Sequence, residues 1–161
     1  MLDIPTKIAA VTPLDGSVVV VGSANADLTV RVAAMPQPGQ TIHGGPLTTL
    51  PGGKSANQAA AAALLGAPTA FVGAVGMDDN GDFLAASLDA CGVDTGNLHR
   101  VKVATSCAII TVDARAENMI VVTEGANNQV DGEILDAARD ALTRAKAVGL
   151  ALEIPIETVI A

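Results

Sequence analysis

Apolar runs that end near a glycine or a loop recur along the chain and predict strands buried on both faces. Val18 to Val21 is a continuous apolar run closed by Gly22, and Ala70 to Val75 is a second run of this kind. Ala147 to Leu152 predicts a third buried strand. Such strands are typical of parallel sheets, because helices cover both faces of those sheets.

Between these strands, the spacing of apolar residues changes to that of helices. Ser55 to Leu65 is rich in alanine and predicts a helix that ends at Gly66. Asn80 to Ala90 has helical spacing, and Asp131 is predicted to cap a helix that includes Leu142. Strands that alternate with helices indicate an α/β core with a parallel sheet.

Two further segments alternate between apolar and polar residues and do not fit that core. Leu28 to Val32 places apolar residues at every second position, which predicts a half-exposed strand. Cys107 to Val112 and Met119 to Thr123 predict two strands on either side of a polar turn. We expect these strands to form a small separate β-layer, built from residues 26–51 and 105–122.

The two ends of the sequence carry weaker patterns. Residues 1–17 are predicted to be a loose leader without the apolar stretch of a signal peptide. Ile156, Val159 and Ile160 have helical spacing, but a helix this short is marginal on its own. We therefore expect the core of residues 18–161 to be incomplete and the chain to be part of a longer protein.

Composition narrows the classes of function. The 161 residues suffice for one domain with a sizeable core. The net charge is −8 and lysines and arginines do not cluster, so we expect no nucleic-acid partner and no membrane partner. The two cysteines cannot form a disulfide scaffold, and no apolar run reaches membrane length, which predicts a cytoplasmic protein.

Seven short motifs occur in a fixed order along the chain. They are Asn-Ala-Asp at 25–27, Pro-Gly-Gln-Thr at 38–41, Gly-Gly-Lys-Ser-Ala-Asn at 52–57, Gly-Met-Asp-Asp-Asn-Gly at 76–81, Gly-Val-Asp at 92–94, Glu-Gly-Ala-Asn at 124–127 and Leu-Glu-Ile-Pro at 152–155. Together they resemble the N-terminal half of the ribokinase (PfkB-type) family of carbohydrate kinases. The resemblance implies a ribokinase-like three-layer α/β/α core with a mainly parallel sheet, and a small β-sheet lid.

The residues in these motifs suit a sugar. Asn25 and Asp27 occupy alternate positions after a predicted strand, so both side chains can point to one side. Amides and carboxylates match sugar hydroxyls, because each hydroxyl both donates and accepts hydrogen bonds. Gly52 and Gly53 allow a close approach of the backbone, and Glu153 ends another strand at the same crevice.

The resemblance assigns roles to individual positions. It implies that the apolar lid contacts come from Ala108 and Ile110. It implies that the sugar is bound by Asn25, Asp27, Gly52, Gly53, Lys54, Asn57 and Glu153. Ser55 stands where the family usually has glycine, and its small side chain could cap the helix that follows.

The implied reaction is ATP-dependent phosphorylation of D-ribose at O5. The resemblance further implies that the full-length enzyme uses ATP, Mg²⁺ and a monovalent cation such as K⁺, and forms a homodimer through the β lid. The family's catalytic motif, Gly-Ala-Gly-Asp, does not occur in the 161 residues. We therefore expect the chain to have no kinase activity by itself and to contain no catalytic, cofactor-binding or metal-binding residue.

Other interpretations compete with this one. Gly53-Lys54-Ser55 resembles the end of a phosphate-binding loop, but position 48 is threonine where that motif needs glycine. A dinucleotide-binding fingerprint would need two more glycines after Gly22. Each polar residue could also be a turn former or a solvated side chain. A non-catalytic sugar-binding or dimerising fragment remains possible, as does a kinase for another sugar or nucleoside.

Overall fold

A computed structural model describes residues 17–161, so the leader predicted for residues 1–17 lies almost wholly outside the described residues. The strands are β1 (Val18–Val21), β2 (Asn25–Arg31), β3 (Thr48–Gly52), β4 (Thr69–Gly76), β5 (Asp94–Val101), β6 (Cys107–Val112), β7 (Asn118–Val122) and β8 (Ala147–Leu150). The helices are α2 (Lys54–Leu64), α3 (Asp79–Ala90), α4 (Gly132–Ala137), α5 (Arg139–Arg144) and α6 (Ile156–Ile160), with a 3₁₀ helix, η1 (Gly125–Gln129).

Four strands form a parallel core sheet in the order β5-β4-β1-β8. Val18 of β1 lies opposite Thr69 of β4 and Ala147 of β8, so all three strands run in register from the same edge. Val19, Val20 and Val21 are each at most 2% exposed. Burial on both sides explains why β1 consists entirely of valine, since a central strand of a covered parallel sheet has no solvent face.

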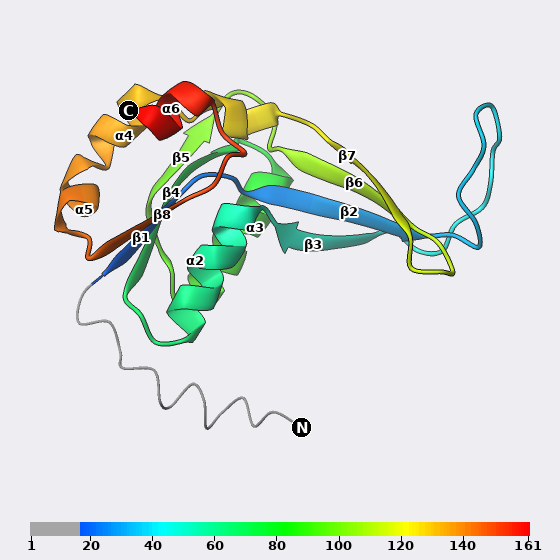
Figure 1. The fold of residues 1–161 in the computed structure, drawn as a ribbon, viewed down its shortest axis with the longest axis horizontal. Helices are drawn as coiled ribbons and strands as arrows, with labels where there is room; N and C mark the ends of the chain where they lie inside the picture. Colours follow the sequence, from blue (N-terminus) through cyan, green and yellow to red (C-terminus); the bar gives the residue numbers. More distant parts are fainter. Residues whose placement is uncertain (1–16) are drawn as a thin grey trace.

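Helices cover both faces of the core sheet, which gives three layers (Figure 1). On one face, Val20 packs with Phe71 and with apolar residues of α2 and α3. On the other face, Val19 and Val21 pack with residues of η1 and α4. The alternation of side chains along β1 divides the core into these two hydrophobic clusters.

The second sheet has the order β3-β2-β6-β7 and extends away from the core, toward the right of Figure 1. Its central pair, β2 and β6, is parallel, and the two outer pairs are antiparallel. The separate β-layer predicted from the alternating pattern is therefore confirmed, as is the α/β class with a parallel core sheet. We call this second sheet the lid sheet.

Several elements differ from the sequence-based expectation. Strand β5 was not expected, β8 is largely exposed where a buried strand was predicted, and the helix predicted after Asp131 is interrupted at Ala138. Strand β2 begins at Asn25, earlier than the predicted Leu28. Asn25 and Asp27 therefore lie within a strand, where alternation places both side chains on the same face of the lid sheet.

Candidate functional site

The candidate site lies where the lid sheet joins the core, at the carboxyl ends of β1 and β8. Gly22, Ser23 and Ala24 connect β1 to β2, and Gly53 connects β3 to α2. The Leu-Glu-Ile-Pro motif at 152–155 follows β8 and reaches the same place. Parallel α/β sheets bind ligands at this end of their strands.

Glu153 is held at the centre of this junction by donors from two other segments. Its Oε2 accepts a hydrogen bond from the Ser23 hydroxyl at 2.6 Å and another from the Lys54 backbone N–H at 3.2 Å. The Lys54 ammonium pairs with Oε1. Burial alone would raise the pKa of Glu153, but the hydrogen bonds from Lys54 and Ser23 outweigh burial and lower it.

The Lys54 ammonium itself contributes little to the stability of the fold. Its side chain is 71% exposed, and exposed ion pairs contribute about 0–1 kcal/mol. The backbone N–H and the Ser23 hydroxyl are the donors that fix the Glu153 carboxylate in place. The ammonium is therefore free to move to a ligand without destabilising the protein.

Asn25 is 5% exposed and faces a second buried amide, Asn127. The Asn127 side-chain Nδ2 donates to Oδ1 of Asn25 at 2.7 Å, and its Oδ1 accepts from the backbone N–H of Ala24 at 3.0 Å. Asn127 comes from η1, after the lid strands, so its contact joins segments 102 positions apart. Both ends of this amide are thus used within the protein.

Asp27 lies two positions further along β2, on the same face as Asn25. No donor among residues 17–161 makes a hydrogen bond to its carboxylate. Burial raises the pKa of Asp27, and the nearby negative charge of Glu153 raises it further. A half-buried carboxylate without a donor is suited to accept hydrogen bonds from ligand hydroxyls.

Two glycines leave space at this junction that a side chain would fill. A Cβ at position 52 would collide with the Asp27 carboxylate. Gly53 has a φ of +92°, and a Cβ there would lie 2.6 Å from the carbonyl oxygen of Ser23. Position 53 therefore requires glycine, because residues with a side chain rarely adopt this φ and because there is no room for a Cβ.

A polar cavity of about 370 Å³ opens beside these groups. Its polar lining comes from the β2 end of the site, from η1 and from the segment after β8. The residues are Asn25, Thr123, Glu124, Asn127, Asn128 and Glu153, and Val122, Ile154 and Pro155 complete the lining. A volume of this size is at the lower end of that found for small-molecule sites.

The lid sheet supplies the apolar residues that the sequence predicted there. Ala108 lies opposite Asp27, and Ile110 lies opposite Thr29, so both share the face of the sheet that carries Asn25 and Asp27. Ala108 is buried and Ile110 is half-buried. The register of β2 and β6 therefore places these two apolar side chains beside the polar side chains of Asn25 and Asp27.

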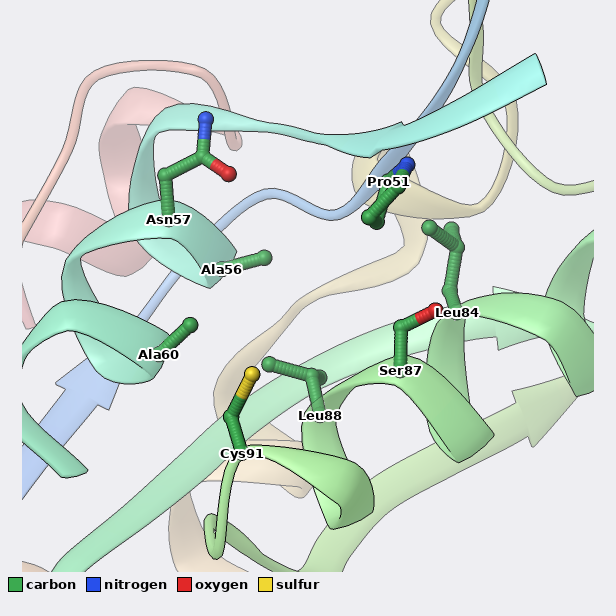
Figure 2. Close-up of a pocket in the computed structure, with 8 residues that line it drawn as sticks. All are labelled: Pro51, Ala56, Asn57, Ala60, Leu84, Ser87, Leu88 and Cys91. Atoms are coloured by element: carbon green, nitrogen blue, oxygen red, sulfur yellow. The ribbon is translucent and has the colours of Figure 1, made fainter. Parts of the chain in front are cut away.

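Among residues 17–161, the Asn57 side chain makes no hydrogen bond to another of the predicted site residues. Its exposed side chain lies on the first turns of α2, beside a separate apolar hollow of about 50 Å³. Figure 2 shows Asn57 at the edge of this hollow, with its amide directed away from Leu88 and Cys91 on the opposite side. In this conformation Asn57 does not line the polar cavity.

Ser55 also behaves differently from the expectation that it could cap α2. The residue before the helix is Gly53, which makes no side-chain cap. The Ser55 hydroxyl instead donates to the carbonyl oxygen of Val21 at 3.3 Å, and its side chain is fully buried against Gly22. The serine thus packs α2 against β1.

Sequence reasoning gave no role to Ser23 or Asn127. Ser23 follows Gly22 in the first motif region, and Asn127 ends the Glu-Gly-Ala-Asn motif. Both could have been noticed as polar residues next to strand ends. Their partners could not, because those partners lie 130 and 102 positions away in the sequence.

The described residues do not fit a metal site. Within residues 17–161, no three His, Cys, Asp or Glu side chains gather as a metal ion would require. We therefore assign no Mg²⁺ or K⁺ ligands to this part of the chain. Among the helices of the same residues, none is both long and apolar enough to cross a membrane.

Comparisons with known proteins agree with this geometry. Residues 15–158 match the model of the family described as pfkB family carbohydrate kinase. A ribokinase of Schizosaccharomyces pombe is 37% identical over 150 residues, which cover 89% of this chain and 47% of the relative. The chain belongs to the pfkB family of carbohydrate kinases, and it spans about half the length of this relative.

Solved structures of the family superpose well on the fold. A ribokinase from Thermotoga maritima matches with a TM-score of 0.82 at 34% identity, covering 89% of this chain and 48% of that one. The structure of Arabidopsis thaliana ribokinase complexed with ribose and ATP matches with a TM-score of 0.75 at 36% identity, covering 90% and 49%. The ribokinase-like fold is therefore shown for this chain.

Proposed function

We propose that this chain is the sugar-recognising part of a kinase that transfers the γ-phosphoryl group of ATP to O5 of D-ribose. The observation that carries the proposal is the gathering of Asn25, Asp27, Gly53, Lys54 and Glu153 where the lid sheet meets the core. Membership of the family supports it, as does the ribose complex of the Arabidopsis relative.

The site would recognise a sugar through complementary donors and acceptors. Asp27 accepts hydrogen bonds from hydroxyls, and these bonds would favour its ionised form and lower the pKa that burial has raised. Lys54 can donate from its exposed ammonium. Glu153 is fixed by Ser23, so it presents its remaining lone pairs in one orientation.

The lid sheet would cover the bound sugar and exclude water. Ala108 and Ile110 share the face that carries Asp27, so they would pack on the apolar edge of the sugar. Exclusion of water matters in phosphoryl transfer, since water competes with the sugar hydroxyl as the acceptor. Gly53, with its positive φ, lies where the lid sheet meets α2 and would serve as a hinge.

We also propose that two copies pair through their lid sheets. On the face opposite to Asp27, Ile109, Met119 and Val121 are each at least 50% exposed. Exposed apolar residues that continue across neighbouring strands mark interaction surfaces. A second copy would bury them, and the oligomeric state in solution is the observable that decides this point.

The chain by itself would bind sugar without phosphorylating it. It spans about half the length of its relatives and lacks the Gly-Ala-Gly-Asp motif that supplies the family's base. A coupled assay of ADP release, with ribose and ATP, should therefore give the background rate. Turnover near that of a complete ribokinase, measured in parallel, would contradict this proposal.

A non-catalytic sugar-binding or dimerising fragment is the second candidate. The intact polar cavity of about 370 Å³ favours it equally, because sugar binding needs only this junction. A kinase for another sugar or nucleoside would use the same donors and acceptors. Screening ribose, deoxyribose, fructose and adenosine by thermal shift separates these substrates.

A further inference from the structure

Asn127 is a buried amide whose orientation is fixed by the backbone. It is 4% exposed, and its Oδ1 accepts from the N–H of Ala24 at 3.0 Å. A backbone N–H can only donate, so the group that faces it must be the oxygen of the amide. The Nδ2 of Asn127 is therefore directed to its other neighbour, the Oδ1 of Asn25, at 2.7 Å.

This contact determines which end of Asn25 remains for a ligand. The Oδ1 of Asn25 is engaged by Asn127, so the NH₂ group is the part of the amide that is left to donate. Asn25 and Asn127 both line the polar cavity beside Glu153. The cavity then carries the Asn25 amide donor beside the Glu153 carboxylate, and Asp27 lies two positions further along β2 on the same face of the lid sheet.

Asn127 is itself anchored to the base of the lid sheet. Its backbone N–H donates to the Ser106 hydroxyl at 3.0 Å, and that hydroxyl donates to the carbonyl oxygen of Glu124. Ser106 immediately precedes β6, and Glu124 follows β7. The residue that orients Asn25 is thus tied to the segment that leads into β6 and to the segment that follows β7.

We infer that Asn127 is a positioning residue that makes Asn25 present a hydrogen-bond donor to the sugar. This inference rests on the proposed function for its ligand. A bound sugar must then offer an oxygen lone pair to Asn25 and hydroxyl hydrogens to Asp27. The alternation of donor and acceptor around the site selects the sugar's orientation, and Asn127 acts on that orientation through its hydrogen bond to Asn25.

Nuclear magnetic resonance of the unmodified chain gives the first test. Side-chain NH₂ signals of Asn25 and Asn127 are assigned, and ribose is added. The Asn127 NH₂ should exchange slowly with solvent, while the Asn25 NH₂ should exchange faster and shift on binding. An Asn25 NH₂ that is protected and does not respond to bound ribose would overturn the inference.

Asn127→Asp gives the second test, because a carboxylate still accepts from Ala24 but cannot donate to Asn25. The Asn25 amide should turn, directing its NH₂ to the new carboxylate and its oxygen to the cavity. Ribose affinity, measured by calorimetry on folded protein, should fall at least about tenfold. Asn118→Asp, at the far end of β7, makes the same chemical change at an exposed position and should bind as the unmodified chain does.

The outcomes separate the inference from the proposed function. If the unmodified chain does not bind ribose, the proposed function fails, and the exchange rates of the two NH₂ groups still test the orientation. If Asn127→Asp is folded and binds ribose as tightly as Asn118→Asp, the positioning role is wrong. If Asn127→Asp lowers the melting temperature but leaves the ribose affinity unchanged, the Asn127 amide has only a structural role.

Discussion

Glu153 illustrates at the scale of one residue how distant segments build the site. Its two nearest donors come from Ser23 and Lys54, which lie 130 and 99 positions earlier in the sequence. These donors lower the pKa of Glu153 against the effect of burial. The carboxylate is therefore part of the folded structure as well as a candidate ligand for the sugar.

The lowered pKa predicts how stability depends on pH. The folded state binds the proton of Glu153 more weakly than the unfolded state does, so this residue stabilises the fold above its unfolded pKa, near 4.5. That contribution is lost as the pH falls through the lower folded pKa. Between pH 5 and pH 3, a range that spans the unfolded pKa near 4.5, the free energy of unfolding in urea should fall less for Glu153→Gln than for the unmodified chain.

The comparison at neutral pH provides the control for this prediction. Glu153→Gln should be less stable than the unmodified chain at pH 7, and the two curves should converge in acid. Curves that stay parallel over the whole range would mean that Glu153 has the same pKa in both states.

Individual site residues could be predicted from sequence where local spacing decides their direction. Asn25 and Asp27 alternate, so their shared face followed from position alone. Ser23 and Asn127 could not be found in this way, because their roles depend on contacts between distant segments. Asn57 shows the converse, since its place in a motif does not bring its side chain into the polar cavity.

At the scale of elements, Asp78 joins the start of α3 to the base of the lid sheet. Its Oδ1 accepts from the N–H of Gly81 at 2.8 Å and from the Thr105 hydroxyl at 2.6 Å, and its Oδ2 accepts from the Thr105 N–H at 2.8 Å. The same hydroxyl accepts from the N–H of Gly76 at 2.8 Å. One carboxylate thus caps a helix and holds the segment that leads into β6.

Two aspartates that cap helices offer a matched comparison. Asp131 caps α4 by accepting from the backbone N–H groups of Glu133 and Ile134, and among residues 17–161 it makes no hydrogen bond to the lid strands. Asp131→Ala should cost about 1 kcal/mol, the usual value of an N-cap. Asp78→Ala should cost about 2–3 kcal/mol, because it also leaves the buried Thr105 donors unpaired.

Urea unfolding measures both losses, and hydrogen exchange locates them. Relative to the unmodified chain, the backbone amides of β6 should exchange faster in Asp78→Ala. Their exchange rates should be unchanged in Asp131→Ala. Equal losses of stability with unchanged exchange in β6 would show that Asp78 acts as a helix cap alone.

Elements with strong periodicity could be predicted, and those shaped by their neighbours could not. β1 and β4 are apolar runs buried on both faces, so sequence identified them. β5 is an edge strand that contains Gly96, Asn97 and Arg100, and it forms only because β4 pairs with it. The start of β2 at Asn25 likewise depends on pairing with Gly52 of β3.

At the scale of the whole molecule, the fold separates a buried core from an exposed lid sheet. The core holds two hydrophobic clusters on either side of the parallel sheet. The lid strands β6 and β7 instead expose Ile109, Met119 and Val121 on one face and Ile120 and Val122 on the other. Sequence alternation predicted such a separate layer, but not the register that aligns Ala108 with Asp27.

Calorimetric titration with ribose at neutral pH tests the central claim most directly, since it needs no catalytic group. The account predicts saturable binding of one ribose per chain, weakened at least about tenfold by Asp27→Ala. Asp140→Ala, an exposed substitution on α5 and distant from the lid sheet, should leave binding unchanged (Figure 1). Folded protein that takes up no ribose, or binds it equally with and without the Asp27 carboxylate, would contradict the account.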